Sequence, residues 1–380
     1  MRLTEPRSLS IQVGLIASIA LLLAFIAGNL QANVARLNID MGFAFLQRTA
    51  GFDIAQALIP YSPSSTYLSA FLVALSNTVL LAAISLTAGT VLGLFVALAR
   101  LSANPLLSLV ALGYIEAVRN IPLLLQLFFW YFSVLGTLPL PRQSLDLFGT
   151  VFLNKRGLSM PAPVAEPTLP AFLIVTLAAL AAAWFLLRRA RQYRVRTGKA
   201  SPALLAAAAA CAALPVLHAL VFSSPISWEV PELRGFNLAG GVVVIPEFVA
   251  MAVGMTVYGS AFIAELIRGG VMTVGKGQTE AGMALGLRRG RIYSKIIIPQ
   301  VFRAVVPPLT GQYITLLKNS SLAAAIGYPD LMLIVAGTTL NQTGQPLEVM
   351  TMVMASYLAL NILISLAGNL INRRMQLVER

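Results

Sequence analysis

The chain has 380 residues, of which 58% are hydrophobic and only 11% are charged, and its formal net charge is +13. Soluble domains contain about 25% charged residues, so this composition excludes a soluble globular fold. The positive charge does not indicate nucleic-acid binding, because basic residues in a membrane protein hold its loops in the cytoplasm.

Long stretches without Asp, Glu, Lys or Arg recur along the chain, and a bilayer core is crossed by about 20 apolar residues. The sequence therefore predicts an all-α, polytopic membrane protein with about eight transmembrane helices. The predicted helices are residues 11–30, 67–99, 112–135, 171–187, 202–222, 242–267, 303–340 and 347–371.

The first predicted helix follows Arg2 and Arg7 and runs to Leu30. It is longer than the apolar region of a signal peptide, about 7–15 residues, and no Ala-x-Ala cleavage site follows it. We expect a retained helix whose N-terminus is cytoplasmic. The seventh predicted helix exceeds one crossing and contains Pro307–Pro308 and Gly327–Pro329, so we expect it to be broken.

Most of the 27 Lys and Arg residues fall in segments that these helices would place on one side. The positive-inside rule puts that side, and both termini, in the cytoplasm. The segment from Arg188 to Lys199 has the highest density of basic residues.

No catalytic arrangement is evident in the sequence. It contains no HExxH, no Ser/His/Asp set and no clustered carboxylates, and single Cys211 and His218 residues exclude disulfide frameworks and Cys/His metal sites. Gly270, Gly275 and Lys276 fit part of a phosphate-binding loop. Gly277 stands where that loop needs a hydroxyl, and a membrane helix precedes it where a strand is required. We expect no cofactor, and no ATPase site in this chain.

A large cytoplasmic loop at residues 268–302, called the coupling loop below, carries the strongest motif. It contains two potential short helices, Thr279–Leu287 and Ile292–Ile298. Gly286 and Gly290 would permit a bend between them, and Pro299 would stop the second.

This loop resembles the signature of importer permeases of the ATP-binding-cassette class, which is EAA, then Gly, then Ile-x-Leu-Pro. Residues at the signature positions are Glu280, Ala281, Gly282, Gly286, Ile296, Ile298 and Pro299. Gly282 replaces the second alanine and Ile298 replaces leucine. The resemblance implies coupling helices that dock on a separate ATPase subunit.

Flanking segments resemble the polar amino-acid branch of this class, which handles residues such as His, Glu, Gln and Arg. The segment 114–132 has its Glu116, Arg119 and Pro122, although Asn120 replaces a more usual glycine. Segments 261–278 and 316–331 are also similar. The resemblance covers about 67–135 and 242–371, and it implies a type I importer permease core.

The extra N-terminal helix and the segment between the two core parts make the chain similar to the larger permease subunits of broad-range L-amino-acid importers. The domain boundaries that follow are residues 1–66 for an N-terminal helix and periplasmic segment, 67–135 and 242–371 for the core, 136–241 for an insertion with two extra helices, and 372–380 for a cytoplasmic tail. The insertion starts and ends outside, so it must cross the bilayer an even number of times.

The resemblance implies an importer in the bacterial inner membrane whose partners are an ATPase subunit, a second permease subunit and a periplasmic amino-acid-binding protein. A secondary amino-acid transporter is the alternative, but such folds commonly contain repeats and acidic residues near the midplane, and we find no repeat. A scaffold or membrane enzyme is a third possibility. The transported amino acids, the pairing of permeases and the role of the insertion stay open.

Several polar residues are candidates for the translocation pathway: Lys318, Asn319, Ser320, Asn77, Glu116 and Arg119. Lys318 could snorkel to the interface or hold a solute carboxylate. Glu116 and Arg119 could form an interfacial ion pair, a gate or an ATPase contact. Glu265 and Arg268 have the same spacing and the same alternatives. Asn77 and Thr78 would form hydrogen bonds between helices.

The topology is testable at Thr197, which lies within the basic segment. In a background lacking Cys211, Thr197→Cys should react with a membrane-permeant thiol reagent and not with an impermeant one added to intact cells. Ready labelling by the impermeant reagent would overturn both the topology and the paired helices of the insertion.

Overall fold

The computed structural model describes residues 6–36, 42–198, 209, 211, 213, 216–217 and 224–375. The chain forms two compact units, one of residues Met1–Gln126 with Met251–Arg380 and one of residues Leu127–Ala250.

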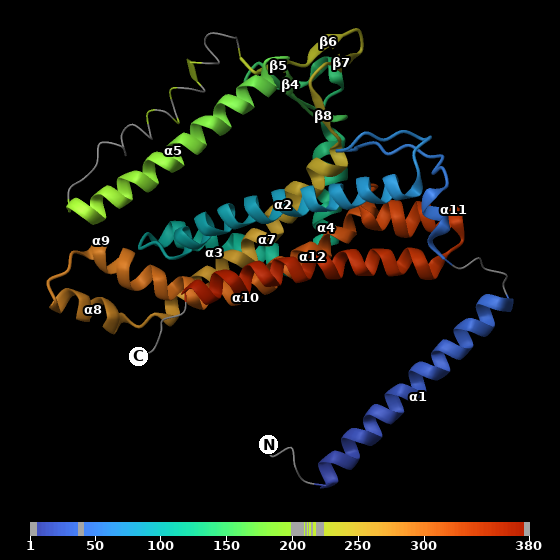
Figure 1. The fold of residues 1–380 in the computed structure, drawn as a ribbon, viewed down its shortest axis with the longest axis horizontal. Coiled ribbons are helices and arrows are strands. Elements are labelled where there is room, and N and C mark those ends of the chain that lie inside the picture. Colours follow the sequence, from blue (N-terminus) through green and yellow to red (C-terminus); the bar gives the residue numbers. More distant parts are fainter. Residues whose placement is uncertain are drawn as a thin grey trace. The chain divides into compact units, whose positions relative to one another are not determined.

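The first unit consists of helices, several of which run side by side (Figure 1). Its elements, including two that cross the unit boundary, are α1 (Pro6–Arg36), η1 (Phe43–Gln47), α2 (Tyr67–Arg100), α3 (Pro105–Asn120), α4 (Leu123–Phe128), α7 (Pro246–Thr273), α8 (Lys276–Ala284), α9 (Arg289–Ile292), η5 (Tyr293–Ile297), α10 (Ile298–Asn319), η6 (Ser320–Ile326), η7 (Met332–Thr339), α11 (Leu340–Thr343) and α12 (Pro346–Met375).

Four helices within the described residues are long and apolar enough to cross a membrane, namely α2, α5 (Leu169–Thr197), α7 and α12. A fifth span results if α3 and the helical segment Leu123–Thr137 count as one, although they meet at an angle of 103°. The prediction of one continuous helix over residues 112–135 is therefore wrong. Ile121 precedes Pro122 and is extended, because a proline ring disfavours the helical conformation of the residue before it.

The predicted break at 303–340 is partly confirmed. α10 passes through Pro307 and Pro308 without interruption. The chain breaks instead after η6, where Gly327 adopts a left-handed φ of 82°, and helical structure resumes at η7. Residues Gly327–Leu331 are called the helix break below.

Small residues allow the helices of the first unit to approach closely. Gly89 and Gly93 of α2 face α7, and a Cβ atom at Gly93 would lie 2.9 Å from both Ile263 Cγ2 and the carbonyl oxygen of Ser260. A Cβ at Gly259 of α7 would lie 2.8 Å from Leu316 Cδ1 of α10. Such small-residue contacts are typical of helix packing in membranes.

The second unit contains short strands that the sequence did not predict. They are β1 (Leu145–Leu147), β2 (Val151–Asn154), β3 (Gly157–Met160), β4 (Ala162–Ala165), β5 (Ile226–Glu229), β6 (Glu232–Arg234), β7 (Asn237–Ala239) and β8 (Val242–Val244). They form an antiparallel sheet in the order β1-β2-β3-β8 and the antiparallel pairs β4-β5 and β6-β7.

The remaining elements of this unit are helical. They are η2 (Phe129–Val134), η3 (Leu135–Thr137), η4 (Pro141–Gln143) and α5. Most of the predicted helix 202–222, including His218, lies outside the described residues, but positions 209, 211, 213, 216 and 217 are helical. Cys211 Sγ lies 3.9 Å from the carbonyl oxygen of Ala179 on α5, which fits a packing role.

Candidate functional site

The first part of the coupling loop is a helix with a glycine stop. α8 begins at Lys276, three residues before the predicted start, and Gly286 follows its C-terminal end with a left-handed φ of 70°. The amide of Gly286 donates to Met283 O at 2.9 Å, and the amide of Leu287 donates to Gly282 O at 3.1 Å. This pair of bonds is a Schellman motif, which favours glycine at the left-handed position. The predicted bend at Gly286 is confirmed, whereas Gly290 lies within α9.

Gly282 departs from the second alanine of the importer signature, and the structure gives a reason. Gly282 is buried in α8, and a Cβ atom there would lie 2.9 Å from Ile292 Cγ1. Ile292 is itself fully buried. α8 and α9 therefore pack through a glycine against an isoleucine, and an alanine at this position would force Ile292 to move.

The remaining signature residues differ in exposure. Glu280 and Ala281 are exposed on α8, and Ile296 is half-buried within η5. Ile298 is exposed and Pro299 occupies the first turn of α10, so Pro299 does not end the second predicted helix. That prediction was wrong because the helical run from α9 through η5 continues into α10 past Pro299. η5 and α10 follow α9 directly.

Large apolar side chains of the coupling loop face solvent. Leu285 is 78% exposed, Tyr293 53% and Met283 45%. The same segment carries Arg288 and Arg289, both exposed. Exposed apolar and aromatic groups beside arginines are the composition of a protein interface.

The helix break is held on α2 by two side chains. Asn77 Nδ2 donates to Pro329 O at 2.9 Å and to Gln56 O at 2.8 Å. Thr78 Oγ1 accepts from the amide of Leu331 at 3.1 Å, and both side chains are fully buried. Asn77 and Thr78 thus make the hydrogen bonds between elements that the sequence suggested, and they satisfy backbone groups that the break leaves without helical partners.

Asp330 is a buried carboxylate that sequence reasoning missed. Its Oδ1 accepts from the amide of Leu333 at 2.8 Å, which caps η7. Its other oxygen, Oδ2, is buried and forms no hydrogen bond within the described residues. An acidic residue inside the apolar stretch after Gly327 was the available signal, because ionisable groups at membrane depth are rare and functional.

The pathway candidates on α10 do not form one cluster. Lys318 is exposed in the last turn of α10, and within the described residues its ammonium has no hydrogen-bond or ion-pair partner. Asn319 is half-buried, whereas Ser320 is buried and donates to Leu317 O at 2.7 Å. Ser320 therefore has a structural contact and Lys318 has none.

Glu116 and Arg119 share α3 but do not pair. Glu116 Oε2 accepts from Asn120 Nδ2 at 3.3 Å, and the Arg119 guanidinium lies 5.3 Å from the ring centroid of Phe262. The ion-pair interpretation of these residues is wrong. Glu265 and Arg268 do form an ion pair, joined through Arg268 Nε at 2.9 Å and through a second nitrogen.

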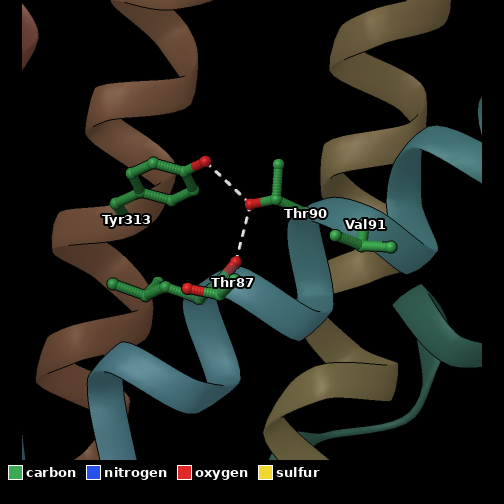
Figure 2. A pocket seen from close by; sticks show the side chains of 5 residues that line it. Thr87, Thr90, Val91 and Tyr313 are labelled. Atoms are coloured by element: carbon green, nitrogen blue, oxygen red, sulfur yellow. Dashed lines mark hydrogen bonds between the residues drawn. The ribbon is translucent and has the colours of Figure 1, made fainter. Parts of the chain in front are cut away.

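A shallow cavity of about 270 Å³ opens where α2 meets α10. Figure 2 shows its lining by Thr87, Thr90 and Val91 of α2 and by Tyr313 of α10. Thr90 Oγ1 and Tyr313 Oη are 2.7 Å apart, and Thr90 Oγ1 also donates to Leu86 O at 2.6 Å. These hydroxyls are engaged in hydrogen bonds between and within the helices, and the rest of the lining is mostly apolar.

Comparisons with known proteins match these features. Residues 89–377 fit the family described as "Binding-protein-dependent transport system inner membrane component". The chain is 45% identical over 369 residues to the putative amino-acid ABC transporter permease protein YhdX of Escherichia coli (strain K12), covering 97% of this chain and 94% of that protein.

A second relative is the general L-amino acid transport system permease protein AapQ of Rhizobium johnstonii, at 42% identity with 96% of this chain and 92% of that protein covered. A third is the glutamate/glutamine/aspartate/asparagine transport system permease protein BztB of Rhodobacter capsulatus, at 35% identity with 99% and 95% covered. The chain belongs to the family of inner-membrane components of binding-protein-dependent transport systems, and its relatives over nearly their whole length are amino-acid transport permeases.

Proposed function

We propose that this chain is the permease subunit of an ATP-driven importer of L-amino acids in the bacterial inner membrane. The observation that carries the proposal is the coupling loop, in which Gly282 lets the short helix α8 pack on Ile292 at the start of the helical run α9–η5–α10 while Met283, Leu285 and Tyr293 stay exposed. The full-length relationship to a general L-amino acid permease and to an acidic and amide amino-acid permease supports the substrate class.

The proposed assembly contains a separate ATPase subunit that receives the coupling loop, a second permease subunit and a periplasmic binding protein that delivers the solute. The family description, which names binding-protein-dependent transport, supports the last of these partners. ATP binding and hydrolysis on the ATPase would switch the permease pair between inward-open and outward-open states.

The proposed topology has about eight spans and both termini in the cytoplasm. The four to five spans found among the described residues form part of it. α1, α10 with η7, and the partly described segment 202–222 would supply the others. In this arrangement α5 and segment 202–222 are an inserted helix pair, and the strands of the second unit lie on the periplasmic side.

The exposed faces of α10 and α12 differ in a way that supports a pathway beside α10. α12 exposes Met354, Leu358, Ile362 and Leu366. α10 exposes Gly311, Thr315 and Lys318 at helical spacing. Lipid accommodates the first set, but a lysine facing hydrocarbon is costly and such groups usually face a bundle interior or a wet cavity. We therefore assign this face of α10 to the second permease and the solute between them.

Coupling is tested by replacing glycines in the loop. Gly286→Ala places a Cβ on a left-handed residue, which costs about 1–2 kcal/mol, and should reduce the affinity for the ATPase and its stimulation by loaded binding protein. Gly290→Ala is the matched control, because Gly290 has no positive φ and no atom lies within 4 Å of its Cβ position.

Gly286→Asn should retain more coupling than Gly286→Ala, since asparagine tolerates the left-handed region. Gly286→Leu is a stronger test of the same bend. Full ATPase stimulation and transport in Gly286→Leu would show that the loop is only a connector.

Lys318 is tested by charge removal. α10 is continuous, so Lys318 lies about 22 Å from Arg303 along the helix axis, deep enough for a solute carboxylate to reach it from the pathway. A charged hydrogen bond contributes about 1.5–3 kcal/mol, so Lys318→Met should weaken uptake of every transported amino acid on the order of tenfold, while Lys318→Arg retains most of it. Amino-acid uptake into proteoliposomes measures the effect of both substitutions. Unchanged uptake by an assembled Lys318→Met complex would leave this residue with a structural role.

A further inference from the structure

α5 continues past its apolar part as a basic helix. Its first part exposes Leu177, Leu180 and Trp184. Its last part, called the basic end of α5, carries five exposed arginines: Arg188, Arg189, Arg191, Arg194 and Arg196. α5 contains no acidic residue, and within the described residues no carboxylate pairs with these arginines. This concentration of charge is therefore not neutralised inside the chain.

Two aromatic residues mark where the apolar part of α5 ends. The guanidinium carbon of Arg188 lies 3.7 Å from the ring centroid of Trp184, and that of Arg189 lies 4.7 Å from the centroid of Phe185. Both arginines thus fold over rings one turn earlier. Tryptophan is enriched at the headgroup level of membranes, and arginine stems cover apolar surface while the charged end reaches polar surroundings. This turn of α5 fits the inner edge of the headgroup layer, and the remaining arginines of the basic end lie beyond it on the headgroup side.

A hollow lies one to two turns further along the helix. It has a volume of about 240 Å³ and is lined by Arg191, Gln192, Val195 and Arg196. Val195 is 82% exposed between the two arginines. The hollow is a shallow, mostly apolar surface on one side of the helix, and Arg191 and Arg196 are among its lining residues, so a lipid phosphate can bind between their side chains.

We propose that the basic end of α5 binds anionic phospholipids of the cytoplasmic leaflet, with the lipid phosphate between Arg191 and Arg196. The inference rests on the topology proposed above, which places this end in the cytoplasm. Clusters of four to eight basic residues directly beyond a membrane helix attract anionic lipids. The lipid surface is the nearest anionic partner, because the basic residues continue directly from the exposed apolar surface of α5.

Lipid binding at this position would give the second unit its own anchor in the membrane. We expect relatives that match the full length of the chain to share this lipid anchor. The permease core, by contrast, carries its partner contacts in the coupling loop. The function assigned to the insertion is thus a lipid contact rather than a solute contact.

The test uses Trp184 as a local reporter. The chain has three tryptophans, so Trp130→Phe with Trp228→Phe leaves Trp184 alone in the full-length chain within its complex. Quenching is compared between dibrominated phosphatidylglycerol and dibrominated phosphatidylcholine in mixed micelles. We expect half-maximal quenching at a mole fraction of phosphatidylglycerol that is about tenfold lower than that of phosphatidylcholine.

Arg191→Gln with Arg196→Gln should abolish this preference. Arg373→Gln with Arg374→Gln is the matched control, because it removes two arginines from the end of another membrane helix, and it should leave the preference unchanged. Raising the salt concentration should weaken the preference in the unmodified protein, since screening reduces surface electrostatics.

Four outcomes would overturn the proposal. They are equal quenching by the two lipids, an equal loss in the Arg373/Arg374 control, displacement by millimolar inorganic phosphate, and loss of the ATPase instead of lipid preference in the Arg191/Arg196 variant. The labelling of Thr197 reads the topology separately. If Thr197→Cys is cytoplasmic and quenching shows no preference, the lipid site fails while the proposed function stands.

Discussion

A break in a membrane helix is possible only where the freed backbone groups find partners, because hydrocarbon offers none. The break at Gly327–Leu331 meets this constraint through two adjacent residues of α2. Asn77 donates to the carbonyl oxygen of Pro329, and Thr78 accepts from the amide of Leu331. Asn77 also binds the carbonyl oxygen of Gln56, so the same side chain ties the segment before α2 to the break.

The coupling loop is continuous with this arrangement. η5 leads directly into α10, and α10 runs without interruption to Asn319, one helical segment before the break. A displacement of the loop by an ATPase would therefore act on a continuous helix whose far end carries Lys318. Gly259 and Gly270 of α7 lie against α10 where a Cβ atom would collide with Leu316 or Val305. Such close packing would let α7 and α10 move together.

The sequence predicted most membrane helices because uncharged apolar stretches are a direct consequence of the bilayer. It predicted the bend at Gly286 because a left-handed residue after a helix favours glycine. It missed the strands of the second unit, which are three or four residues long and lack the alternation that identifies a strand. It placed a stop at Pro299 and a break at Pro307–Pro308 or Gly327–Pro329, yet all three prolines before Gly327 lie inside α10 and the break occurs at Gly327. A proline in the sequence does not by itself show whether it ends a helix, breaks it or lies within it. Asp330 was missed although an acidic residue in an apolar stretch was a signal, and the fold shows that it is fully buried.

The central claim is that α2 holds the helix break, and removing the hydrogen bond from the Leu331 amide to Thr78 tests it. Thr78→Val keeps the side-chain shape and removes the acceptor, and Ser76→Ala removes a hydroxyl that donates to Val73 O within α2. Amide hydrogen exchange of Leu331 in the purified protein is the measurement. The account predicts exchange faster by on the order of tenfold in Thr78→Val, since leaving a buried donor unpaired costs about 1–3 kcal/mol, and no change in Ser76→Ala. Equal protection of Leu331 in both variants would contradict it.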